Sequence, residues 1–257
     1  MSFKLASLFD LTGKTVLVTG GNSGIGLAMA RALGLAGASI ILAARRNHET
    51  TEAVESLQSE SISASGLVVD LAVNNCGKVV QEGLSVLSAS PDILVNAAGV
   101  NLREPFMDVA ADAFDLHMAL HLRAPFLLTQ ALAPRMAERR FGRIINIASL
   151  QSYRAFANSA PYGAAKGGVV QLTRAIAEEW SVHGITCNAI APGFFPTPLT
   201  AAVFGDPERA AKNAAQTAIG RNGALDDLTG VTVFLASAAS AYITGQTLAV
   251  DGGFTAK

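Results

Sequence analysis

A tyrosine and a lysine lie four positions apart in Tyr162-Gly163-Ala164-Ala165-Lys166. Residues at i and i+4 of a helix share a face, so the Lys166 amine can lie near the Tyr162 hydroxyl. A free tyrosine has a pKa of about 10, and a nearby ammonium favours the phenolate and lowers that pKa. The pair therefore predicts a tyrosine that exchanges a proton with a substrate oxygen near neutral pH. An ordinary solvated helix face has the same spacing, so the prediction depends on further residues.

Ser149 is one such residue, because it follows the apolar segment Ile144–Ile147 at the end of a predicted buried strand. Ligands of open α/β sheets bind at the carboxyl ends of parallel strands. We therefore expect Ser149 to lie at the ligand-binding edge of the sheet. The alternative is that this serine is only a helix cap or a turn residue.

A glycine-rich turn, Thr19-Gly20-Gly21-Asn22-Ser23-Gly24-Ile25-Gly26, follows the first apolar segment. Glycine permits a tight turn and lets backbone N–H groups approach a pyrophosphate, and a helix N-terminus adds partial positive charge. The spacing is Gly-x-x-x-Gly-x-Gly, which differs from the standard dinucleotide fingerprint, and no P-loop Gly-Lys-Ser/Thr follows. We predict that this turn binds a cofactor.

These residues need strands that end at a common edge. Short apolar segments without polar alternation occur along the whole chain, as is typical of parallel strands buried on both faces. They are Thr15–Thr19, Ser39–Ala44, Leu67–Val69, Ile93–Val95, Arg143–Ile147, Thr186–Ile190 and Thr247–Val250. Helix-sized segments lie between them, and one helix face is indicated by Val169, Leu172, Ile176 and Trp180. We predict one α/β domain over residues 1–257, a doubly wound parallel sheet of about seven strands flanked by helices.

The composition argues against several partner classes. The 257 residues are 50% hydrophobic and 15% charged, with a net charge of −1, so a large core is possible and no basic excess attracts nucleic acid. No apolar segment approaches the roughly 18–20 residues of a membrane helix, and residues 1–14 do not resemble a signal peptide. Cys76 and Cys187 match no metal-ligand spacing. We expect two reduced thiols in a cytoplasmic protein without a bound metal.

The motifs occur in the order found in the short-chain dehydrogenase/reductase family, which the chain resembles from about Leu11 to Gly253. The matching segments are Thr19–Gly26, Asn96-Ala97-Ala98-Gly99, Ser149, Tyr162 with Lys166, Pro192-Gly193, Tyr242–Gln246 and Asp251–Gly253. The resemblance implies a single Rossmann-type domain, a nicotinamide cofactor and, usually, a homotetramer.

The resemblance also implies residue roles. Tyr162 matches the general acid/base, Ser149 the donor to the reacting oxygen, and Lys166 the residue that binds the nicotinamide ribose and tunes the tyrosine. Asp70 matches the adenine contact, Asn96 a residue that steadies the sheet, and Thr197 the carboxamide ligand. The full set expected around the cofactor is Gly20, Asn22, Ser23, Gly24, Ile25, Gly26, Arg45, Asp70, Leu71, Asn96, Ala97, Ala98, Gly99, Tyr162, Lys166, Pro192, Gly193, Phe195 and Thr197.

The chain departs from the family pattern at one catalytic position. The family usually has an asparagine in the helix after the Asn-Ala-Gly motif, where it holds a water of the proton relay. Alignment on Phe126 puts His121 there. Imidazole can donate and accept and titrates near neutrality, so we expect His121 to replace the asparagine as a catalytic residue. The alternative is an impaired relay in a slow or retired enzyme.

The end of the second strand bears on the choice of nicotinamide. NAD-binding members usually have an acid there to hold the ribose 2′-hydroxyl, whereas this chain has Ala44 followed by Arg45. An arginine fork suits a 2′-phosphate, so NADP(H) is favoured over NAD(H). Asn22 occupies the position of a second basic residue in the glycine turn. The alternative is that Arg45 and Arg46 are merely a solvated basic pair.

Substrate residues are expected on two loops and a lid. Residues 99–105 resemble the Gly-x-x-Arg-Arg-x-Pro of family members that act on sugar acids such as gluconate, with one arginine, Arg103, kept. Residues 198–220 resemble a mobile lid with Leu199, Val203 and Phe204 facing a ligand. The polar residues expected around the substrate are Arg103, Gln151, Arg154 and Asn158.

Two classes of function follow. The first is an NAD(P)-dependent oxidoreductase of a small carbonyl or secondary alcohol, with a sugar acid or polyol favoured and a 3-oxoacyl reductase as the runner-up. The second is a weakly catalytic dinucleotide-binding sensor or scaffold. Intact Ser149, Tyr162 and Lys166 favour the first class, and only His121 favours the second.

Overall fold

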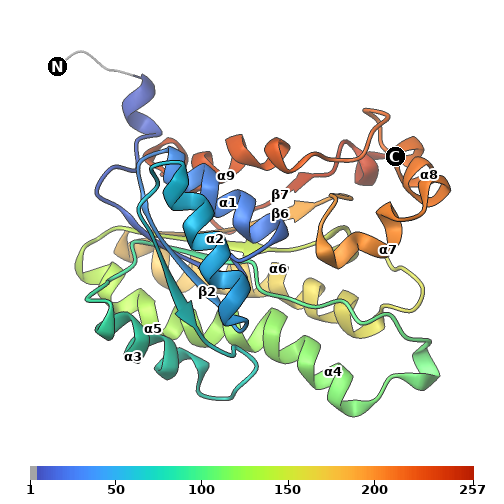
Figure 1. Ribbon diagram of the computed structural model, residues 1–257, viewed down its shortest axis with the longest axis horizontal. Helices are drawn as coiled ribbons and strands as arrows, with labels where there is room; N and C mark the ends of the chain where they lie inside the picture. The colour runs from blue at the N-terminus through green and yellow to red at the C-terminus, as the bar shows by residue number, and fades with distance from the viewer. Residues whose placement is uncertain (1–4) are drawn as a thin grey trace.

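The computed structural model describes residues 5–257; residues 1–4, which belong to the segment predicted not to be a signal peptide, lie outside it. Its centre is a seven-stranded sheet in which every neighbouring pair is parallel, in the order β3-β2-β1-β4-β5-β6-β7 (Figure 1). The strands are β1 (Thr15–Thr19), β2 (Ser39–Ala44), β3 (Ala64–Val68), β4 (Ile93–Asn96), β5 (Gly142–Ile147), β6 (Ile185–Pro192) and β7 (Thr247–Val250). The predicted doubly wound α/β fold is confirmed.

Helices cover both faces of the sheet (Figure 1). One layer contains α1 (Gly24–Leu35), α2 (Asn47–Ser59) and α9 (Thr229–Ala236). The other contains α3 (Cys76–Val86), α4 (Ala111–Met118), α5 (Ala124–Glu138) and α6 (Ala160–Trp180). Two short helices, α7 (Ala201–Phe204) and α8 (Pro207–Gln216), follow β6 and lie near the C-terminus.

The strand sequences explain the two layers. Successive side chains of a strand point to opposite faces, so a strand covered on both sides must be apolar throughout. In β1, Val16 and Val18 pack in the core under α1 and α9, whereas Leu17 packs in the core under α3 and α5. The edge strands β3 and β7 are partly exposed along their length.

The predicted strand limits agree with the structure at β1, β2 and β7 and differ elsewhere by a few residues. The largest difference is at β3, which begins at Ala64 although only Leu67–Val69 looked like a strand. Its first residues, Ala64-Ser65-Gly66, lack apolar bulk because β3 is an edge strand. The predicted helix face is confirmed, since Val169 and Ile176 are buried and Leu172 and Trp180 pack against the core that contains Ile176.

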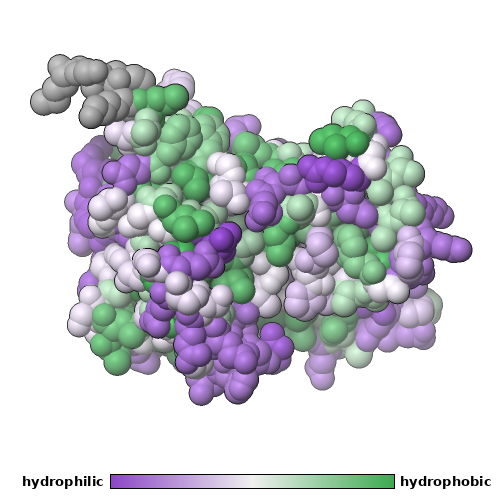
Figure 2. All heavy atoms as spheres, turned by 45° about the horizontal axis from the view of Figure 1, so that its top comes forward, coloured by the Kyte–Doolittle hydropathy of each residue, from purple (hydrophilic) through white to green (hydrophobic). Residues whose placement is uncertain are grey.

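The outer surface over α1, α2 and α9 mixes hydrophilic and hydrophobic side chains without a continuous apolar face (Figure 2). Such scattered apolar residues are normal on a folded surface. Among residues 5–257, no helix is both long and apolar enough to cross a membrane. Cys76 and Cys187 are free and buried.

Candidate active site

A cavity of about 730 Å³ lies at the carboxyl ends of the strands. It extends past β1 and β4, where the strand order reverses and where ligands of such sheets bind. Of the residues expected around a cofactor, all but Asn96 line it. The expected catalytic residues also line it: Ser149, Tyr162, Lys166 and His121.

The glycine turn is held close to the end of β4. Gly20 has a φ of 63°, and a side chain there would meet the Cα of Ala98 at 2.7 Å. A side chain on Gly26 would collide with the backbone oxygen of Gly20. The Thr19 hydroxyl accepts hydrogen bonds from the amides of Ala97 (3.0 Å) and Ala98 (3.1 Å). The first turn of α1 thus presents free N–H groups to the cavity, which fits the pyrophosphate of a dinucleotide.

Asn96 was expected among the cofactor residues, but it does not line the cavity. Its side chain is buried and donates to the Oδ1 atom of Asn146 at 2.8 Å, linking β4 to β5. Asn146 in turn donates to the Thr173 hydroxyl on α6 at 2.9 Å. This network agrees with the other role expected of Asn96, which is to steady the central sheet.

Ser149 and Tyr162 come together because β5 and α6 meet at this edge. Ser149 caps a 3₁₀ turn directly after β5, and its hydroxyl accepts the Gln151 amide at 3.1 Å. Tyr162 lies in the first turn of α6 and is 8% exposed. The Ser149 side chain lies within hydrogen-bonding reach of Tyr162 and acts to lower the pKa of its hydroxyl. A substrate oxygen near both hydroxyls would therefore meet a hydrogen-bond donor and a proton-exchanging group.

Lys166 is buried one helical turn after Tyr162. Its Nζ donates to the backbone oxygen of Ile147 and lies 5.6 Å from the centroid of the Tyr162 ring. The Ser152 hydroxyl donates to the backbone oxygen of Lys166 at 2.8 Å, which joins the serine turn to the helix. Burial lowers the pKa of Lys166 to about 7, because the charged amine loses its hydration.

The pKa of Tyr162 is raised above its usual value, which is opposite to the direction expected from Lys166 alone. Burial disfavours the phenolate and is the largest cause. The hydrogen bond with Ser149 and the charge of Arg103 act in the opposite direction. Lys166, with its own pKa of about 7, is only partly charged near neutrality.

His121 lies in a π-helical turn, Ala119–Arg123, between α4 and α5. Pro125 has no N–H to continue the α-helical ladder, and the amide of Ala124 bonds five residues back to Ala119. The His121 Nε2 lies 2.6 Å from the Val100 oxygen, and its Nδ1 has no protein partner among the described residues. Its ring lies edge-on to Tyr162, with 5.1 Å between centroids, and a side chain on Gly99 would collide with it.

The pKa of His121 is lowered well below its usual value, so the ring is neutral near pH 7. Burial is the main cause, and the charge of Lys166 adds to it, whereas the bond to Val100 acts in the opposite direction. His121 and Lys166 are therefore within electrostatic reach of each other.

Ala44, Arg45 and Arg46 line the end of the cavity after β2. Arg46 forms an exposed ion pair with Glu49 at 3.1 Å, within the first turn of α2. No ion pair involves Arg45 among residues 5–257. Asp70 also lines the cavity, and its Oδ1 accepts the Ala72 amide at 2.9 Å.

Only two of the four residues expected around the substrate, Arg103 and Gln151, line the cavity. Arg154 lies outside it, with its guanidinium 5.0 Å above the Phe254 ring. Asn158 also lies outside, in a left-handed conformation with φ of 59°, and its backbone oxygen accepts the Glu104 amide at 3.1 Å. All of these residues are polar, so their polarity alone could not show which of them line the cavity and which only shape the loop between Ser149 and Tyr162.

Several lining residues were not expected from the sequence. Phe156 and Phe194 line the substrate end and form an aromatic cluster with the buried Phe254. Arg209, near the start of α8, also lines the cavity. Of the three expected lid residues, Leu199 and Val203 line the cavity and Phe204 does not.

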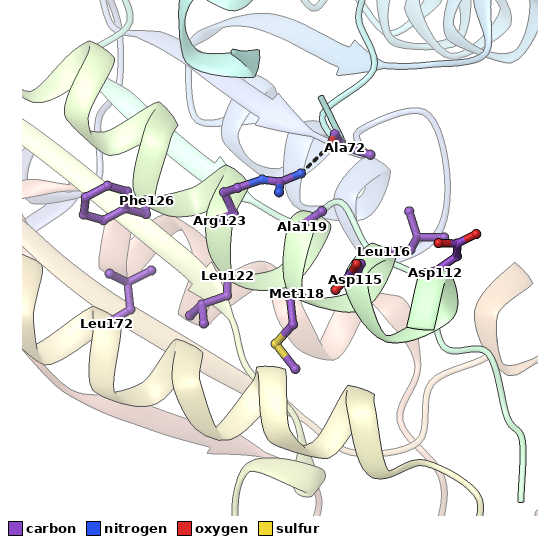
Figure 3. A pocket seen from close by; sticks show the side chains of 10 residues that line it. All are labelled: Ala72, Asp112, Asp115, Leu116, Met118, Ala119, Leu122, Arg123, Phe126 and Leu172. Carbon is purple, nitrogen blue, oxygen red and sulfur yellow. Dashed lines mark hydrogen bonds between the residues drawn. The ribbon is translucent and has the colours of Figure 1, made fainter. Parts of the chain in front are cut away.

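A second hollow, of about 720 Å³, lies on the outer side of α4 and α5 (Figure 3). Leu122, Phe126 and Leu172 form its apolar part, and Asp112 and Asp115 lie at the other end. The Arg123 side chain crosses it to donate to the backbone oxygen of Ala72 at 2.5 Å. It contains none of the expected catalytic residues, so the first cavity is the candidate active site.

Comparison with known proteins agrees with this site. A family model described as enoyl-(acyl carrier protein) reductase matches residues 20–255. Gluconate 5-dehydrogenase of Gluconobacter oxydans (strain 621H) is 37% identical over 251 residues, covering 96% of this chain and 97% of the relative. The 5-keto-D-gluconate 5-reductase of Escherichia coli (strain K12) is 37% identical over 246 residues, with 96% and 97% covered.

A solved structure of a gluconate 5-dehydrogenase from Burkholderia cenocepacia J2315, in complex with NADP and tartrate, has a TM-score of 0.94 and 37% identity. The match covers 99% of this chain and 100% of that chain. These likenesses extend over the whole sheet and over the cavity that contains Ser149, Tyr162 and Lys166. The chain belongs to the short-chain dehydrogenase/reductase family of NAD(P)-dependent oxidoreductases.

Proposed function

We propose that the protein interconverts a secondary alcohol and a ketone of a sugar acid, with NADP(H) as the favoured cofactor. The observation that carries this proposal is the arginine at the substrate end of the catalytic cavity. Arg103 lines the cavity, and its charge acts on the Tyr162 hydroxyl. A carboxylate of the substrate can pair there while its reacting carbon lies at the tyrosine.

In this mechanism Tyr162, a neutral phenol, donates its proton to the substrate oxygen during reduction, and during oxidation it accepts the hydroxyl proton as its own proton passes onward toward Lys166. Ser149 bonds the same substrate oxygen and holds it toward the tyrosine. The nicotinamide, when bound, supplies or accepts the hydride at the substrate carbon. Lys166, with a pKa of about 7, can pass a proton onward from the buried site.

His121 would extend this relay. Its ring is neutral and its Nδ1 has no protein partner among the described residues, so that nitrogen can accept a hydrogen bond from a water or an amine. We propose that it acts in place of the asparagine usual in the family, next to Lys166. A retired enzyme is less favoured, because Ser149, Tyr162 and Lys166 share one cavity.

The preference for NADP(H) rests on the end of β2. Ala44 offers no carboxylate to a 2′-hydroxyl, and Arg45 lines the same end of the cavity. A guanidinium there would bind a 2′-phosphate with two parallel hydrogen bonds. The solved relative from Burkholderia cenocepacia contains NADP, which supports the same choice.

The segment 198–220 would act as the lid. Leu199 and Val203 bring apolar side chains to the cavity, and Arg209 brings a charge. Closing such a segment excludes water and strengthens charge pairing inside. We therefore expect substrate binding to order this segment.

We also propose a homotetramer in the cytoplasm. Phe126 is half exposed beside Leu122 and Leu172 in the hollow of Figure 3, and a second copy of the chain would cover these apolar side chains. Light scattering should then give about four times the 26.5 kDa of one chain. The two free, buried cysteines suit a reducing compartment.

A substrate screen tests the proposed function. D-gluconate, related sugar acids, neutral polyols and 3-oxoacyl thioesters are assayed with NADP(H) and NAD(H), in both directions. We expect turnover of a sugar acid to exceed that of its uncharged polyol. Turnover confined to acyl thioesters would favour the 3-oxoacyl reductase instead. Cofactor binding with no turnover of any class would favour the sensor or scaffold.

A further inference from the structure

A second buried histidine, His117, lies one helical turn before His121 and is 1% exposed. It does not line the cavity. Its ring stacks on His121 with 6.0 Å between centroids and lies edge-on to Tyr162 at 6.4 Å. A polar side chain this deeply buried needs partners for its ring nitrogens.

Both nitrogens have such partners, and together they define the tautomer. The Leu102 amide donates to Nε2 at 3.2 Å, so Nε2 must be the unprotonated nitrogen. Nδ1 then carries the proton and donates to the backbone oxygen of Ala113 at 2.7 Å, in the preceding turn of α4. The ring therefore ties the loop after β4 to α4, the helix that leads into the turn of His121.

This tie matters because the loop has few other anchors. Val100 is bonded to His121, the Asn101 side chain accepts the Ser159 hydroxyl at 3.0 Å, and the Glu104 amide donates to Asn158. Leu102 is 40% exposed and provides little apolar anchoring. At Leu102, the bond to His117 is thus the main constraint.

Arg103 lies between the anchors at Leu102 and Glu104. No ion pair holds its guanidinium among residues 5–257. Its side chain is exposed, and only the backbone on either side directs it toward the cavity. The position of this charge depends on the loop.

We propose that His117 is a positioning residue for substrate recognition, which holds the loop 100–104 so that Arg103 stays at the cavity beside Tyr162. The inference rests on the proposed sugar-acid reaction, in which Arg103 pairs with the carboxylate. His117 touches neither substrate nor cofactor. It acts on the loop through its hydrogen bond with the Leu102 amide.

Two near-isosteric variants separate the two ring bonds. In His117→Gln, the side-chain oxygen can take the place of Nε2 and accept the Leu102 amide. In His117→Asn, the shorter amide can replace Nδ1 and bond Ala113 but cannot reach Leu102. Both remain polar and smaller than histidine, so they carry a similar packing loss. His117→Gln is therefore the matched control for His117→Asn.

The first readout needs no substrate. Hydrogen exchange is followed in the segment 99–104 of the intact protein by mass spectrometry. We expect His117→Asn to speed exchange there by about tenfold or more, corresponding to the loss of about one hydrogen bond. His117→Gln should exchange like the parent. Equal exchange in His117→Asn and the parent would overturn the proposal.

The second readout uses D-gluconate and D-glucitol, which differ in the charge at C1. His117→Asn should raise KM for D-gluconate about five- to tenfold and change KM for D-glucitol less than twofold, with His117→Gln close to the parent. In an Arg103→Ala background, His117→Asn should have no further effect on the D-gluconate KM. Equal increases in KM for both compounds, or additive increases in the Arg103→Ala background, would show that His117 has only a structural role.

The two readouts distinguish failure of the inference from failure of the proposed function. If the parent turns over no sugar acid, the proposed function fails, and the exchange experiment still decides whether His117 holds the loop. If the parent turns over D-gluconate and the variants show no selective KM effect, only the role of His117 fails.

Discussion

The cofactor half of the cavity is shaped by backbone, whereas the substrate half is shaped by side chains on loops. In the cofactor half, Gly20 and Gly26 bring chain segments into direct contact, and the Thr19 hydroxyl accepts two amides that directly follow β4. In the substrate half, Arg103 and Phe156 come from separate loops. Buried histidines hold one of those loops to a helix.

This difference determines what a substitution does in each half. Where backbone segments are in contact, an added side chain would collide, but the chemistry of neighbouring side chains has little effect on the contact. Side chains on loops can be replaced without disturbing the sheet, and each replacement changes one interaction with the substrate. We therefore expect variants in the substrate half to lose turnover or selectivity and to keep their cofactor affinity. Variants at the end of β2 should change their cofactor affinity and keep their turnover.

The largest expected effect is that of Tyr162→Phe. Removing the hydroxyl should lower kcat by at least about 100-fold, the usual scale for positioned acid–base catalysis. The dissociation constant of NADPH, measured by fluorescence titration, should change less than about threefold, because the phenol contacts the substrate more than the dinucleotide. Near-parental turnover in this variant would remove the mechanism, and a large loss of cofactor affinity would contradict the division into halves.

Arg103→Ala should have the next largest effect. Charge-assisted hydrogen bonds contribute roughly 1.5–3 kcal/mol, or about ten- to a hundredfold in binding. KM for a sugar acid should rise by that factor, and KM for the matching neutral polyol should hardly change. The measurement is steady-state kinetics on D-gluconate and D-glucitol. Equal changes for both compounds would show that Arg103 does not pair with a carboxylate.

The cofactor half was the easier part to predict from the sequence. Glycine spacing and buried strands are local patterns, and they led to the sheet and to the glycine turn at its edge. Asn96 is the exception, because its strand-end position is the same whether it faces a ligand or Asn146. The direction of the Asn96 side chain is determined by its partner on β5, Asn146, which lies 50 positions later in the chain.

The substrate half could be predicted only in part. Arg103 and Gln151 line the cavity, but Arg154 turns to Phe254, a residue 100 positions later. Phe156 and Arg209 were missed for the same reason, since no local pattern places them at the cavity. His117 gave no signal either, because its partners at Leu102 and Ala113 are backbone groups.

A smaller effect is expected at the end of β2. Ala44→Asp would place a charge against a 2′-phosphate and an acceptor beside a 2′-hydroxyl. The parent should bind NADPH more tightly than NADH, and the variant should reverse that order by about tenfold, as expected for one charge-assisted bond. Turnover with the preferred cofactor should stay within about threefold. A parent that binds NADH more tightly would show the cofactor preference to be wrong.

The smallest effect is expected for His121→Asn, which is also the finest test of the boundary between the halves. Burial keeps this ring neutral in the folded protein, because its pKa lies well below 6.5. The unfolded chain binds a proton near pH 6.5 and the folded protein does not, so His121 makes stability fall as pH decreases from about 6.5 toward its folded pKa. His121→Asn should remove this part of the acid sensitivity while keeping a polar group that can bond Val100.

Thermal unfolding between pH 8 and pH 5 measures the effect. The parent should lose stability below about pH 6.5 more steeply than His121→Asn, by up to about 1.4 kcal/mol per pH unit. The control is His48→Asn, since the His48 side chain is 82% exposed and paired with Glu52 on the surface. Its stability profile should follow that of the parent.

His121→Asn should also retain most of the activity, whereas His121→Leu, which can neither donate nor accept a hydrogen bond, should lose the activity. If His121→Leu were as active as the parent, the imidazole would only fill space between Gly99 and Tyr162, and the relay would not pass through it.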